Sequence, residues 1–353
     1  MQSATVRGRF KTMITPRKAP TIQDVARQAG VSAATVSRVL SAPGRVSEST
    51  RDRVHQAVRE TGYTINQAAR SLRQRTARAL LLVVPDLGNA FYSTIVDAVI
   101  REAAVSNYSV TVATSIADDP NRWIGDYLLS SRADGMLLFD GSLETNRLHG
   151  LDGEGTLPLV AAYDEIPDEK INSVITDNRL AAMRAVRHLV EFGHRDIGHI
   201  IGPSRNANRN ERHLGFLAAM AEAGLPVLDE WVYQGDYRVT SAEAAAEYFL
   251  TAPKLPTAVF AANDEMALGL IHRLRQNGVD CPRDISVIGF DDIPMSPYMT
   301  PPLTTMRQPR QQIGEVATRA LINIIEGNSL ADAPVHIVLK AELVVRESTR
   351  RIN

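Results

Sequence analysis

Residues 21–40 read TIQDVARQAGVSAATVSRVL, and this stretch decides what the N-terminal part of the chain can fold into. Its first half carries apolar residues at helical spacing, namely Ile22, Val25, Ala26 and Ala29. Gly30 follows them and tolerates the left-handed backbone that ends such a helix. At the other end, the Thr21 hydroxyl can cap the helix while Asp24 reaches back to Thr21, as in a capping box. The pattern predicts a short amphipathic helix.

A second short helix is predicted directly after the turn. Ser32 can cap it, and its apolar residues Val36, Val39 and Leu40 face inward at helical spacing. Two short helices joined by a tight turn are typical of a helix-turn-helix unit, whose second helix meets DNA. This arrangement turns Ala33, Ala34, Ser37 and Arg38 outward, toward a partner.

A third helix is predicted from Ser47 to about Thr61, with Gly62 ending it. Three short helices share only a small core, so we expect a compact head over residues 20–64. Residues 65–78 then form a basic linker. Its segment 66–73 favours helix but is too short to persist as a helix by itself.

Charge is distributed unevenly along this chain of 353 residues, although the formal net charge is only −1. Residues 1–78 hold 15 Lys and Arg against four Asp and Glu, an excess of 11 positive charges. Because the whole chain has 39 Lys and Arg and 40 Asp and Glu, the remainder holds 24 against 36. A basic head on an acidic body predicts that only the head contacts nucleic acid.

Residues 1–19 are basic and lack the apolar segment of a secretory signal, so we expect a disordered basic arm, with Met13 as an alternative start to Met1. No apolar run approaches the roughly 20 residues of a membrane span, and no membrane partner is expected. Cys281 is the single cysteine, which excludes an intramolecular disulfide. A bacterial cytoplasmic protein associated with the nucleoid fits these features.

From Ala79 onward, short apolar runs alternate with helical patterns. Strands are predicted at 79–84, 110–114, 135–139, 157–161, 173–175, 197–201, 258–261 and 287–290. Helices are predicted at 91–104, 180–191, 209–223, 240–250, 265–276 and 313–325, and residues 301–305 are expected to be a non-helical crossover. Repeated strand–helix–strand units indicate doubly wound parallel sheets, and the segment is too long for one sheet. We therefore predict an α/β body of two similar subdomains with a cleft between them.

Polar side chains follow several of these strands, at the sheet edge where open α/β folds bind ligands. Asp291, Asn263 and Arg212 together offer a carboxylate, an amide and a guanidinium, a set that can clamp vicinal hydroxyls. The aromatic rings of Tyr237, Phe91 and Tyr92 can stack on a sugar or a base, although each of these residues alone is more often part of a core than a ligand contact.

Asx residues at strand ends also serve as helix caps. Asp177 and Asn178 follow one strand and Asp264 follows another, and capping is the favoured interpretation of Asn178 and Asp264. Signals of catalysis are missing, since the chain has no nucleophile elbow, phosphate-binding glycine loop or Gly-x-Gly-x-x-Gly. The histidines at 188, 194 and 199 are spaced for neither a zinc helix nor a triad, so turn or surface positions are expected. We predict no catalytic activity, metal or cofactor.

The second predicted helix carries the chemistry of a DNA reader. Ser32, Thr35 and Ser37 are hydroxyl donors suited to phosphate oxygens, and Arg38 can bind guanine O6 and N7 bidentately. Leu72 has two interpretations. The residues alone favour an apolar position in a partly buried linker helix over a wedge between base steps in the minor groove.

Longer motifs run through the whole chain: residues 21–40, 46–51, 62–63 and 66–72 in the head and linker, then VPDLGNAFY at 84–92, FGHR at 192–195, ANDEMALG at 262–269, IGFDD at 288–292 and PLTTMRQP at 302–309. As a set they resemble the lactose-repressor/galactose-repressor family, and within it the body resembles the purine and cytidine repressors. The resemblance implies a helix-turn-helix head on a periplasmic-binding-protein-like body spanning 79–353. Its N-subdomain would comprise about 79–177 and 308–337, and its C-subdomain about 178–307 and 338–353.

The resemblance also implies roles for individual residues. A homodimer would read a palindromic operator through Ser32, Ala33, Ala34, Thr35, Ser37, Arg38 and Thr50, while Leu72, supported by Asn66 and Ala69, would be the wedge at the operator centre. Effector contacts would come from Arg212, Tyr237, Asn263 and Asp291, with Phe91, Tyr92 and Asp177 as neighbours. Asn206 stands where the purine repressor carries an arginine, which argues against a purine effector.

We therefore expect a transcriptional repressor whose operator affinity is switched by a small sugar or nucleoside bound in the cleft. Binding would change the angle between the subdomains and thereby the order of the hinge helices. Release from DNA and recruitment to it are both compatible with the sequence. The alternative is a solute-binding protein for a sugar or nucleoside without regulatory output, in which the basic head would have no use.

Overall fold

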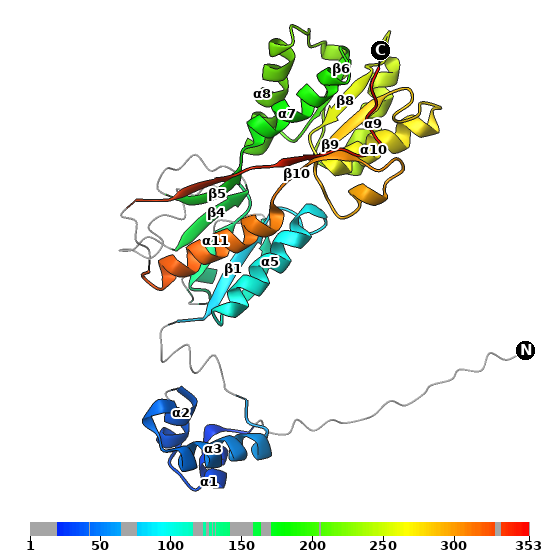
Figure 1. The fold of residues 1–353 in the computed structure, drawn as a ribbon. Coiled ribbons are helices and arrows are strands. Elements are labelled where there is room, and N and C mark those ends of the chain that lie inside the picture. The colour runs from blue at the N-terminus through cyan, green and yellow to red at the C-terminus, as the bar shows by residue number, and fades with distance from the viewer. Residues whose placement is uncertain are drawn as a thin grey trace, which may run out of the picture. The chain divides into compact units, whose positions relative to one another are not determined.

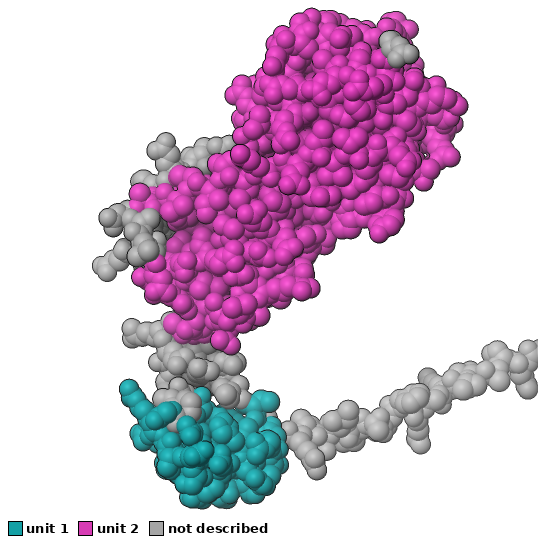
Figure 2. All heavy atoms as spheres, in the orientation of Figure 1, with its two compact units in different colours: residues 1–74 teal, residues 75–353 magenta. Residues whose placement is uncertain are grey.

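The computed structural model describes residues 20–41, 43–64, 76–115, 123–124, 127–128, 130, 132–141, 158–163, 171–204, 206–328 and 333–352 (Figure 1). The chain divides into two compact units, residues 1–74 and residues 75–353 (Figure 2). The expected basic arm at 1–19 and most of the expected linker, including Asn66, Ala69 and Leu72, lie outside the described residues.

The first unit contains the three predicted helices, α1 (Ile22–Ala29), α2 (Ala33–Ser41) and α3 (Glu48–Thr61), with a 3₁₀ turn η1 (Pro43–Arg45) before α3. The Asp24 carboxylate accepts hydrogen bonds from the backbone N–H and the hydroxyl of Thr21, at 2.9 and 2.7 Å. Gly30 ends α1 with a φ of 63°, in the left-handed region that glycine adopts readily. The helix-turn-helix prediction is confirmed.

A small apolar core holds the three helices together. Val25, Val36 and Val54 are completely buried, one from each helix, and Val39 and Ala57 join them. The Arg53 guanidinium donates to the carbonyl of Ala29 at 2.6 Å, so α3 also satisfies the C-terminal end of α1.

The second unit contains two six-stranded sheets. The first has the order β11-β5-β4-β3-β1-β2 and is parallel throughout. Its strands are β1 (Ala79–Val84), β2 (Ser109–Thr114), β3 (Gly135–Leu138), β4 (Leu159–Tyr163), β5 (Asn172–Thr176) and β11 (His336–Leu339). The central strand β1 is buried along its whole length, as a continuous apolar run in a parallel sheet should be.

The second sheet has the order β12-β10-β9-β8-β6-β7, and only the β10–β12 pair is antiparallel. Its strands are β6 (Ile197–Ile201), β7 (Val232–Gln234), β8 (Ala258–Ala261), β9 (Ser286–Asp291), β10 (Thr304–Arg307) and β12 (Glu342–Val344). The chain thus passes between the sheets three times, after β5, after β10 and after β11. This is the predicted α/β body of two doubly wound sheets.

Helices cover the sheets. α5 (Phe91–Val105) and α11 (Arg310–Ile325) pack against each other beside the first sheet, and Figure 1 shows them side by side. α7 (Asn178–Glu191) pairs with α8 (Ala207–Glu222), and α9 (Val239–Thr251) pairs with α10 (Asp264–Gln276), all beside the second sheet. Two further 3₁₀ turns, η3 (Asp229–Trp231) and η4 (Ser296–Tyr298), lie in loops of the second half.

The sequence-based assignment missed four strands. β7, β11 and β12 have three or four residues with little full burial, so they lack the apolar runs that marked the other strands. β10 begins at Thr304, inside the stretch expected to be a crossover. The crossover itself falls at Gln308 and Pro309, between β10 and α11.

Candidate functional site

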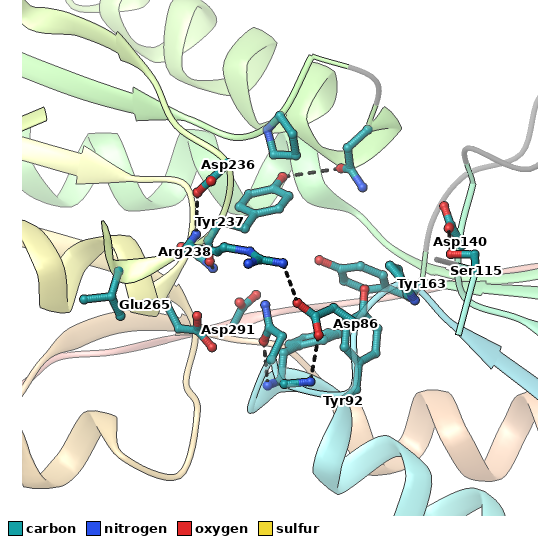
Figure 3. Close-up of a pocket in the computed structure, with 18 of the residues that line it drawn as sticks. Asp86, Tyr92, Ser115, Asp140, Tyr163, Asp236, Tyr237, Arg238, Glu265 and Asp291 are labelled. Atoms are coloured by element: carbon teal, nitrogen blue, oxygen red, sulfur yellow. Dashed lines mark hydrogen bonds and ion pairs between the residues drawn. The ribbon is translucent and has the colours of Figure 1, made fainter. Parts of the chain in front are cut away.

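A cavity of about 880 Å³ lies where the carboxyl ends of strands from both sheets face each other (Figure 3). The first sheet contributes the loop after β1 and the residues that end or follow β2, β3 and β4. The second sheet contributes residues that follow β6, β7 and β8, and the last residue of β9. The lining residues are Pro85, Asp86, Gly88, Asn89, Phe91, Tyr92, Ser115, Asp140, Tyr163, Pro203, Asn206, Asp236, Tyr237, Arg238, Val239, Thr240, Asn263, Glu265 and Asp291. Of the seven sequence-predicted effector residues, five are in this lining, and Arg212 and Asp177 are not.

Arg212 lies behind the cavity wall, completely buried on α8. Its guanidinium donates to the carbonyl of Ala262 at 2.6 Å, to Asn178 Oδ1 at 2.9 Å and to the Tyr163 hydroxyl at 3.2 Å. Its Cζ also lies 3.8 Å from the ring centroid of Phe290. Burial opposes the charge, but the facing oxygens outweigh it and the pKa of Arg212 is raised. Arg212 is therefore a fixed buried cation that supports the wall.

Asp291, the last residue of β9, is the acidic partner of that cation. It is 3% exposed, and its Oδ1 lies 3.7 Å from Arg212 Nη2 and accepts from Gln308 Nε2 at 2.7 Å. Both contacts reach Oδ1, and among the described residues no donor reaches Oδ2. Burial raises the pKa of Asp291 to about 6, against the opposing effects of Arg212 and Gln308. The free oxygen can accept a ligand hydroxyl.

Asn263 and Tyr237 form one connected piece of the wall. Asn263 caps α10 by accepting from the Met266 N–H, and its amide donates to the Tyr237 carbonyl, each at 2.9 Å. The Tyr237 ring lies over Gly202, where an added Cβ would come within 2.3 Å of it. Its hydroxyl donates to Asn206 Oδ1 at 3.3 Å. Asn263 therefore has two roles: it holds Tyr237 in position and it lines the cavity.

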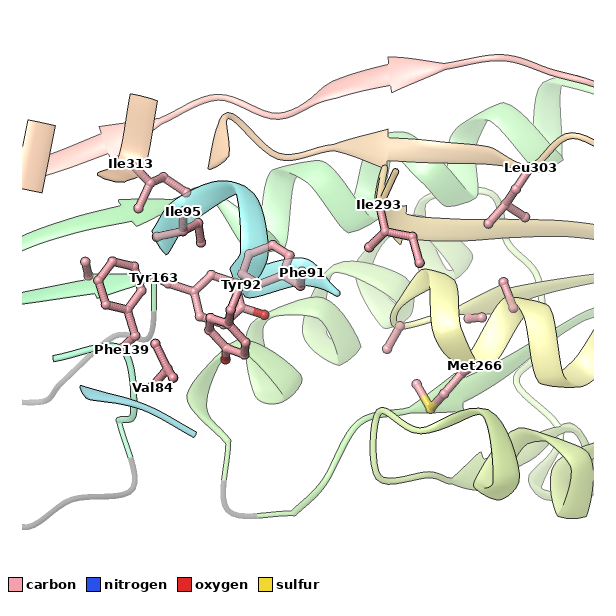
Figure 4. Packing of buried hydrophobic residues seen from close by; sticks show 14 of the residues in the cluster. Val84, Phe91, Tyr92, Ile95, Phe139, Tyr163, Met266, Ile293, Leu303 and Ile313 are labelled. Carbon is pink, nitrogen blue, oxygen red and sulfur yellow. The ribbon is translucent and has the colours of Figure 1, made fainter. Parts of the chain in front are cut away.

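Three aromatic side chains form the opposite wall. Phe91 and Tyr163 have ring centroids 4.5 Å apart, and Tyr92 meets Phe91 edge-on at 5.2 Å. All three are less than 10% exposed, and Figure 4 shows them packed together at the end of the first sheet. These three residues belong to the hydrophobic core and also line the cavity.

Backbone strain concentrates in this lining. Tyr163, Tyr237 and Asp291 have φ values of 72°, 71° and 115°, which side-chain-bearing residues rarely adopt. Each such residue costs about 1–3 kcal/mol, and residues of this kind cluster at ligand sites. The strained backbone therefore supports the interpretation of the cavity as a ligand site.

Two of the expected helix caps are displaced by one residue. Asp177 caps α7 by accepting from the Leu180 N–H at 2.9 Å, and Asn263 caps α10, whereas Asn178 and Asp264 are the residues that follow. Asn178 instead links Arg212, Asn208 and the Thr176 carbonyl. Asp264, fully buried, accepts from the Ile293 N–H and from two hydroxyls. The capping interpretation of Asn178 and Asp264 was wrong because a cap must stand just before the first helical residue.

The sequence reasoning missed the charged rim of the cavity. Arg238 after β7 reaches Asp86 after β1, with Nη2 and Oδ2 3.1 Å apart, and Figure 3 shows this pair spanning the pocket. Glu265 accepts from the Ala90 N–H at 3.3 Å, so it too joins the two sheets' loops. Burial raises the pKa of Glu265. The signal that could have found Asp86 and Asp140 was the one used for Asp291, a polar residue just after a predicted strand, whereas Asp236 follows β7, which the sequence did not reveal.

Carboxylates dominate the described lining. Five are present, namely Asp86, Asp140, Asp236, Glu265 and Asp291, against Arg238 as the one cation among the described lining residues. Asp140 accepts from the Ser115 hydroxyl and Asp236 accepts from the Arg238 N–H at 2.9 Å. Such a lining suits hydroxyl and amine donors and disfavours anions.

The three histidines singled out by spacing are buried and hydrogen-bonded, which corrects the expectation of turn or surface positions. Their partners are Thr349 for His188, Thr257 and the Arg350 carbonyl for His194, and the Phe260 carbonyl for His199. Burial lowers the pKa of His199 to about 3. In the part of the chain that the structure describes, no group of three or more His, Cys, Asp or Glu side chains could hold a metal ion, and no helix could cross a membrane.

In the first unit, α2 presents the expected outward face. Val36 and Val39 point into the core, while Ser32, Ala34 and Arg38 are exposed and Ala33, Thr35 and Ser37 are partly exposed. Ser32 Oγ accepts from the Thr35 N–H at 3.1 Å and so caps α2. Thr50, in the first turn of α3, accepts from the Ser47 hydroxyl at 2.9 Å.

Comparisons with known proteins agree with this architecture. Residues 21–66 match the family described as bacterial regulatory proteins, lacI family, and residues 186–349 match the periplasmic binding protein-like domain. The transcriptional repressor CytR of Escherichia coli K12 is 35% identical over 341 residues, 95% of this chain and 97% of CytR. The repressor PurR of Vibrio campbellii is 34% identical over 335 residues, 94% and 99% of the two chains.

Solved structures give the same result. The lac repressor dimer bound to operator and the anti-inducer ONPF superposes with a TM-score of 0.85 at 28% identity, covering 94% of this chain and 100% of that one. A complex of the regulator CelR with cellobiose has a TM-score of 0.71 at 33% identity, covering 93% and 99%. The helix-turn-helix head, the two-sheet body and the relatives CytR and PurR, which are transcriptional repressors, together place the chain in the lacI family of bacterial regulatory proteins.

Proposed function

We propose that this protein is a cytoplasmic transcriptional repressor that binds a palindromic operator as a homodimer and responds to a small sugar or nucleoside in the cavity. The observation that carries the proposal is the presence, in one chain, of an exposed recognition-type helix and a strained, polar cavity between two sheets. A solute-binding protein needs only the second of these.

The DNA-binding role falls to the head at residues 20–64. Arg38 on the exposed face of α2 reads base edges, while Ser32, Thr35, Ser37 and Thr50 contact phosphate or sugar. Small side chains at Ala33 and Ala34 let the helix approach the groove. Following the family resemblance, Leu72 has the role of the wedge in the hinge at 65–78, and Asn66 and Ala69 have supporting roles.

The effector-binding role falls to the body at residues 79–353. Oδ2 of Asp291 and the polar rim accept hydrogen bonds from the hydroxyls of the effector, and the Tyr237, Phe91 and Tyr92 rings supply apolar faces. Arg212 acts from behind by holding Asp291 and Tyr163, and Asp177 acts only as the cap of α7. A sugar is supported by the cellobiose complex of CelR, and a nucleoside by the aromatic wall.

The switch uses the contacts that span the cavity. Arg238 with Asp86, and Glu265 with the Ala90 N–H, both tie the loop after β1 to the second sheet's side. An effector that engages both sides favours one angle between the subdomains, but only by its difference in affinity for the two states. The change in angle alters the order of the hinge and hence the affinity for DNA.

A two-step experiment tests the proposal. A thermal-shift screen of unphosphorylated sugars and nucleosides should find a compound that raises the melting temperature, because a ligand bound only by the native state stabilises it. DNA selected by the full-length protein from a random duplex pool should be palindromic, and the compound should change its affinity. A stabilising compound without any selected DNA would favour a solute-binding protein, and the absence of both would refute the proposal.

A further inference from the structure

Two consecutive carboxylates at the end of β9 face different parts of the molecule. Asp291 faces the cavity, whereas Asp292, 9% exposed, faces the chain segments that cross between the sheets. Both residues have positive φ values, 115° and 53°. Because each such conformation costs about 1–3 kcal/mol, contacts elsewhere must hold this pair in place.

Asp292 has those contacts. One carboxylate oxygen accepts from Arg307 Nε at 2.7 Å and the other from Arg346 Nη2 at 2.6 Å. The Asp292 carbonyl accepts from Arg310 Nη2 at 2.5 Å. Arg346 is anchored in turn by donating to the Leu303 carbonyl at 2.7 Å. Asp292 therefore binds three arginines, two of which, Arg307 and Arg310, flank the crossover between β10 and α11.

The β10–α11 crossover is one of the segments that connect the subdomains. Arg307 ends β10 in the second sheet, Arg310 begins α11 beside the first sheet, and Arg346 follows β12 after the chain has returned. Between Arg307 and Arg310, Gln308 donates to Asp291 Oδ1 at 2.7 Å and is itself 2% exposed. A single hydrogen bond, from Gln308 to Asp291, therefore links the cavity carboxylate directly to the crossover.

The crossover also has unused hydrogen-bonding capacity. Gln308 Oε1 and Arg310 Nη1 are buried and have no partner among the described residues. A buried unpaired polar atom is costly, so this arrangement is a poor energy minimum for the crossover taken alone. It is maintained by the bonds to Asp291 and Asp292, and a change at Asp291 can let Gln308 and Arg310 repack.

We propose that Asp292 is a positioning residue that fixes the Gln308–Arg310 crossover and thereby couples it to Asp291. This inference rests on the proposed function only in taking the cavity as the effector site. Asp292 contacts no effector itself. It converts the occupancy of the Asp291 carboxylate into a change at the junction that sets the angle between the subdomains.

Hydrogen exchange of the full-length protein without ligand tests the positioning role directly. Asp292→Asn keeps the size of the side chain and removes its charge, and the matched control is Asp284→Asn, an exposed carboxylate paired with Arg283 at 2.9 Å. We expect exchange in peptides covering 286–292 and 304–310 to rise about tenfold or more in Asp292→Asn, because a buried ion pair loses one partner. Exchange in the head peptides at 22–61 should not change. Wild-type exchange at 286–292 and 304–310 would overturn the proposal.

A second readout separates positioning from mere stabilisation. Cytidine, adenosine, D-ribose, D-glucose and cellobiose serve as probes, and the one that shifts the wild type is titrated into each variant with and without selected operator DNA. Asp292→Asn should bind it within about threefold of wild type while the effect on DNA affinity is mostly lost. If probe binding and the effect of the probe on DNA affinity were lost together, Asp292 would have only a stabilising role. If Asp292→Asn does not fold, Arg307→Gln, at the half-exposed partner, gives the milder version of the same test.

If no probe shifts the wild-type protein, the effector role of the cavity is in doubt. The exchange measurement still decides whether Asp292 positions the crossover, because it needs no ligand.

Discussion

Arg212 Nη2 and Asp291 Oδ1 lie 3.7 Å apart in the wall of the cavity, with Arg212 completely buried and Asp291 3% exposed. The remaining donors of Arg212 go to Asn178, the Ala262 carbonyl and Tyr163, so the guanidinium cannot turn toward a ligand. Among the described residues, none donates a hydrogen bond to Asp291 Oδ2. The cation therefore fixes the wall, while the anion keeps one oxygen that a ligand hydroxyl could reach.

Asp291→Asn should weaken effector binding while leaving effector-free DNA binding intact. A hydrogen bond to a charged group contributes about 1.5–3 kcal/mol, so we expect affinity to fall by about tenfold to a hundredfold. Calorimetry measures the effector affinity and a gel-shift titration the DNA affinity. Asp284→Asn on the protein surface should change neither. Unaltered effector affinity in Asp291→Asn would remove this carboxylate from the binding site.

The acidic lining should discriminate against phosphorylated compounds. A phosphate brought among five carboxylates meets like charge at short range and must find its only described lining cation, Arg238, already paired with Asp86. We expect a 5′-monophosphate to bind at least about tenfold more weakly than its nucleoside, and a sugar phosphate more weakly than its sugar. Thermal shifts of matched pairs at two salt concentrations check this. Equal thermal shifts within each pair would show that the carboxylates do not discriminate against negatively charged ligands.

Two buried carboxyls should make stability and effector binding depend on pH in opposite directions. Burial raises the pKa of Asp264 to about 7 and of Asp291 to about 6, above the ordinary 3.8. The folded state therefore binds more protons than the unfolded state between about pH 4 and pH 7, so these groups lower the free energy of unfolding as pH rises through that window. Effector binding needs ionised Asp291 and should strengthen over the same range.

Urea unfolding at several pH values in this window measures the first effect. Asp264→Asn should show a flatter dependence than wild type, because one of the two titrating groups is gone. Parallel curves for the two proteins would show that Asp264 is ionised throughout. Calorimetric titration of effector over the same pH values measures the second effect.

Arg38→Ala should reduce specific DNA binding far more than non-specific binding. Arg38 is exposed on α2, between the inward-facing Val36 and Val39, and a bidentate contact to a base is worth about 1–3 kcal/mol of discrimination. The matched control is Arg27→Ala, an exposed arginine on α1 of the same head. Competition titrations against selected and scrambled duplexes make the comparison. Equal losses for both duplexes would reduce Arg38 to a phosphate contact.

The elements of the fold that the sequence predicts well are those whose physical cause is local. The capping pair Thr21 and Asp24, the left-handed Gly30 and the buried run of β1 were all visible as short patterns. The edge strands β7, β11 and β12 were not, because a half-exposed strand of three or four residues is defined by its neighbour and not by its own composition.

The candidate site was predicted in part for the same reason. Asp291 and Asn263 were found because they follow strands with strong apolar signals. Tyr163 was missed, although it lines the cavity and accepts a hydrogen bond from Arg212, because it ends β4 two residues beyond the strand predicted at 157–161. The role of Arg212 behind the wall, and the pairing of Arg238 with Asp86, depend on contacts between segments far apart in the chain, which no local pattern encodes.

Gly202→Ala should weaken effector binding by displacing Tyr237. An added Cβ would lie 2.3 Å from Tyr237 Cζ and 2.5 Å from its hydroxyl, so the ring must move and its bond to Asn206 is lost. Because Gly202 does not need a left-handed backbone, the substitution should leave the fold intact, and a melting curve verifies this. A double-mutant cycle with Tyr237→Ala isolates the cause. Once the ring is absent, Gly202→Ala should have little further effect on effector affinity, whereas an equal loss in both backgrounds would mean that Gly202 acts through something other than the tyrosine.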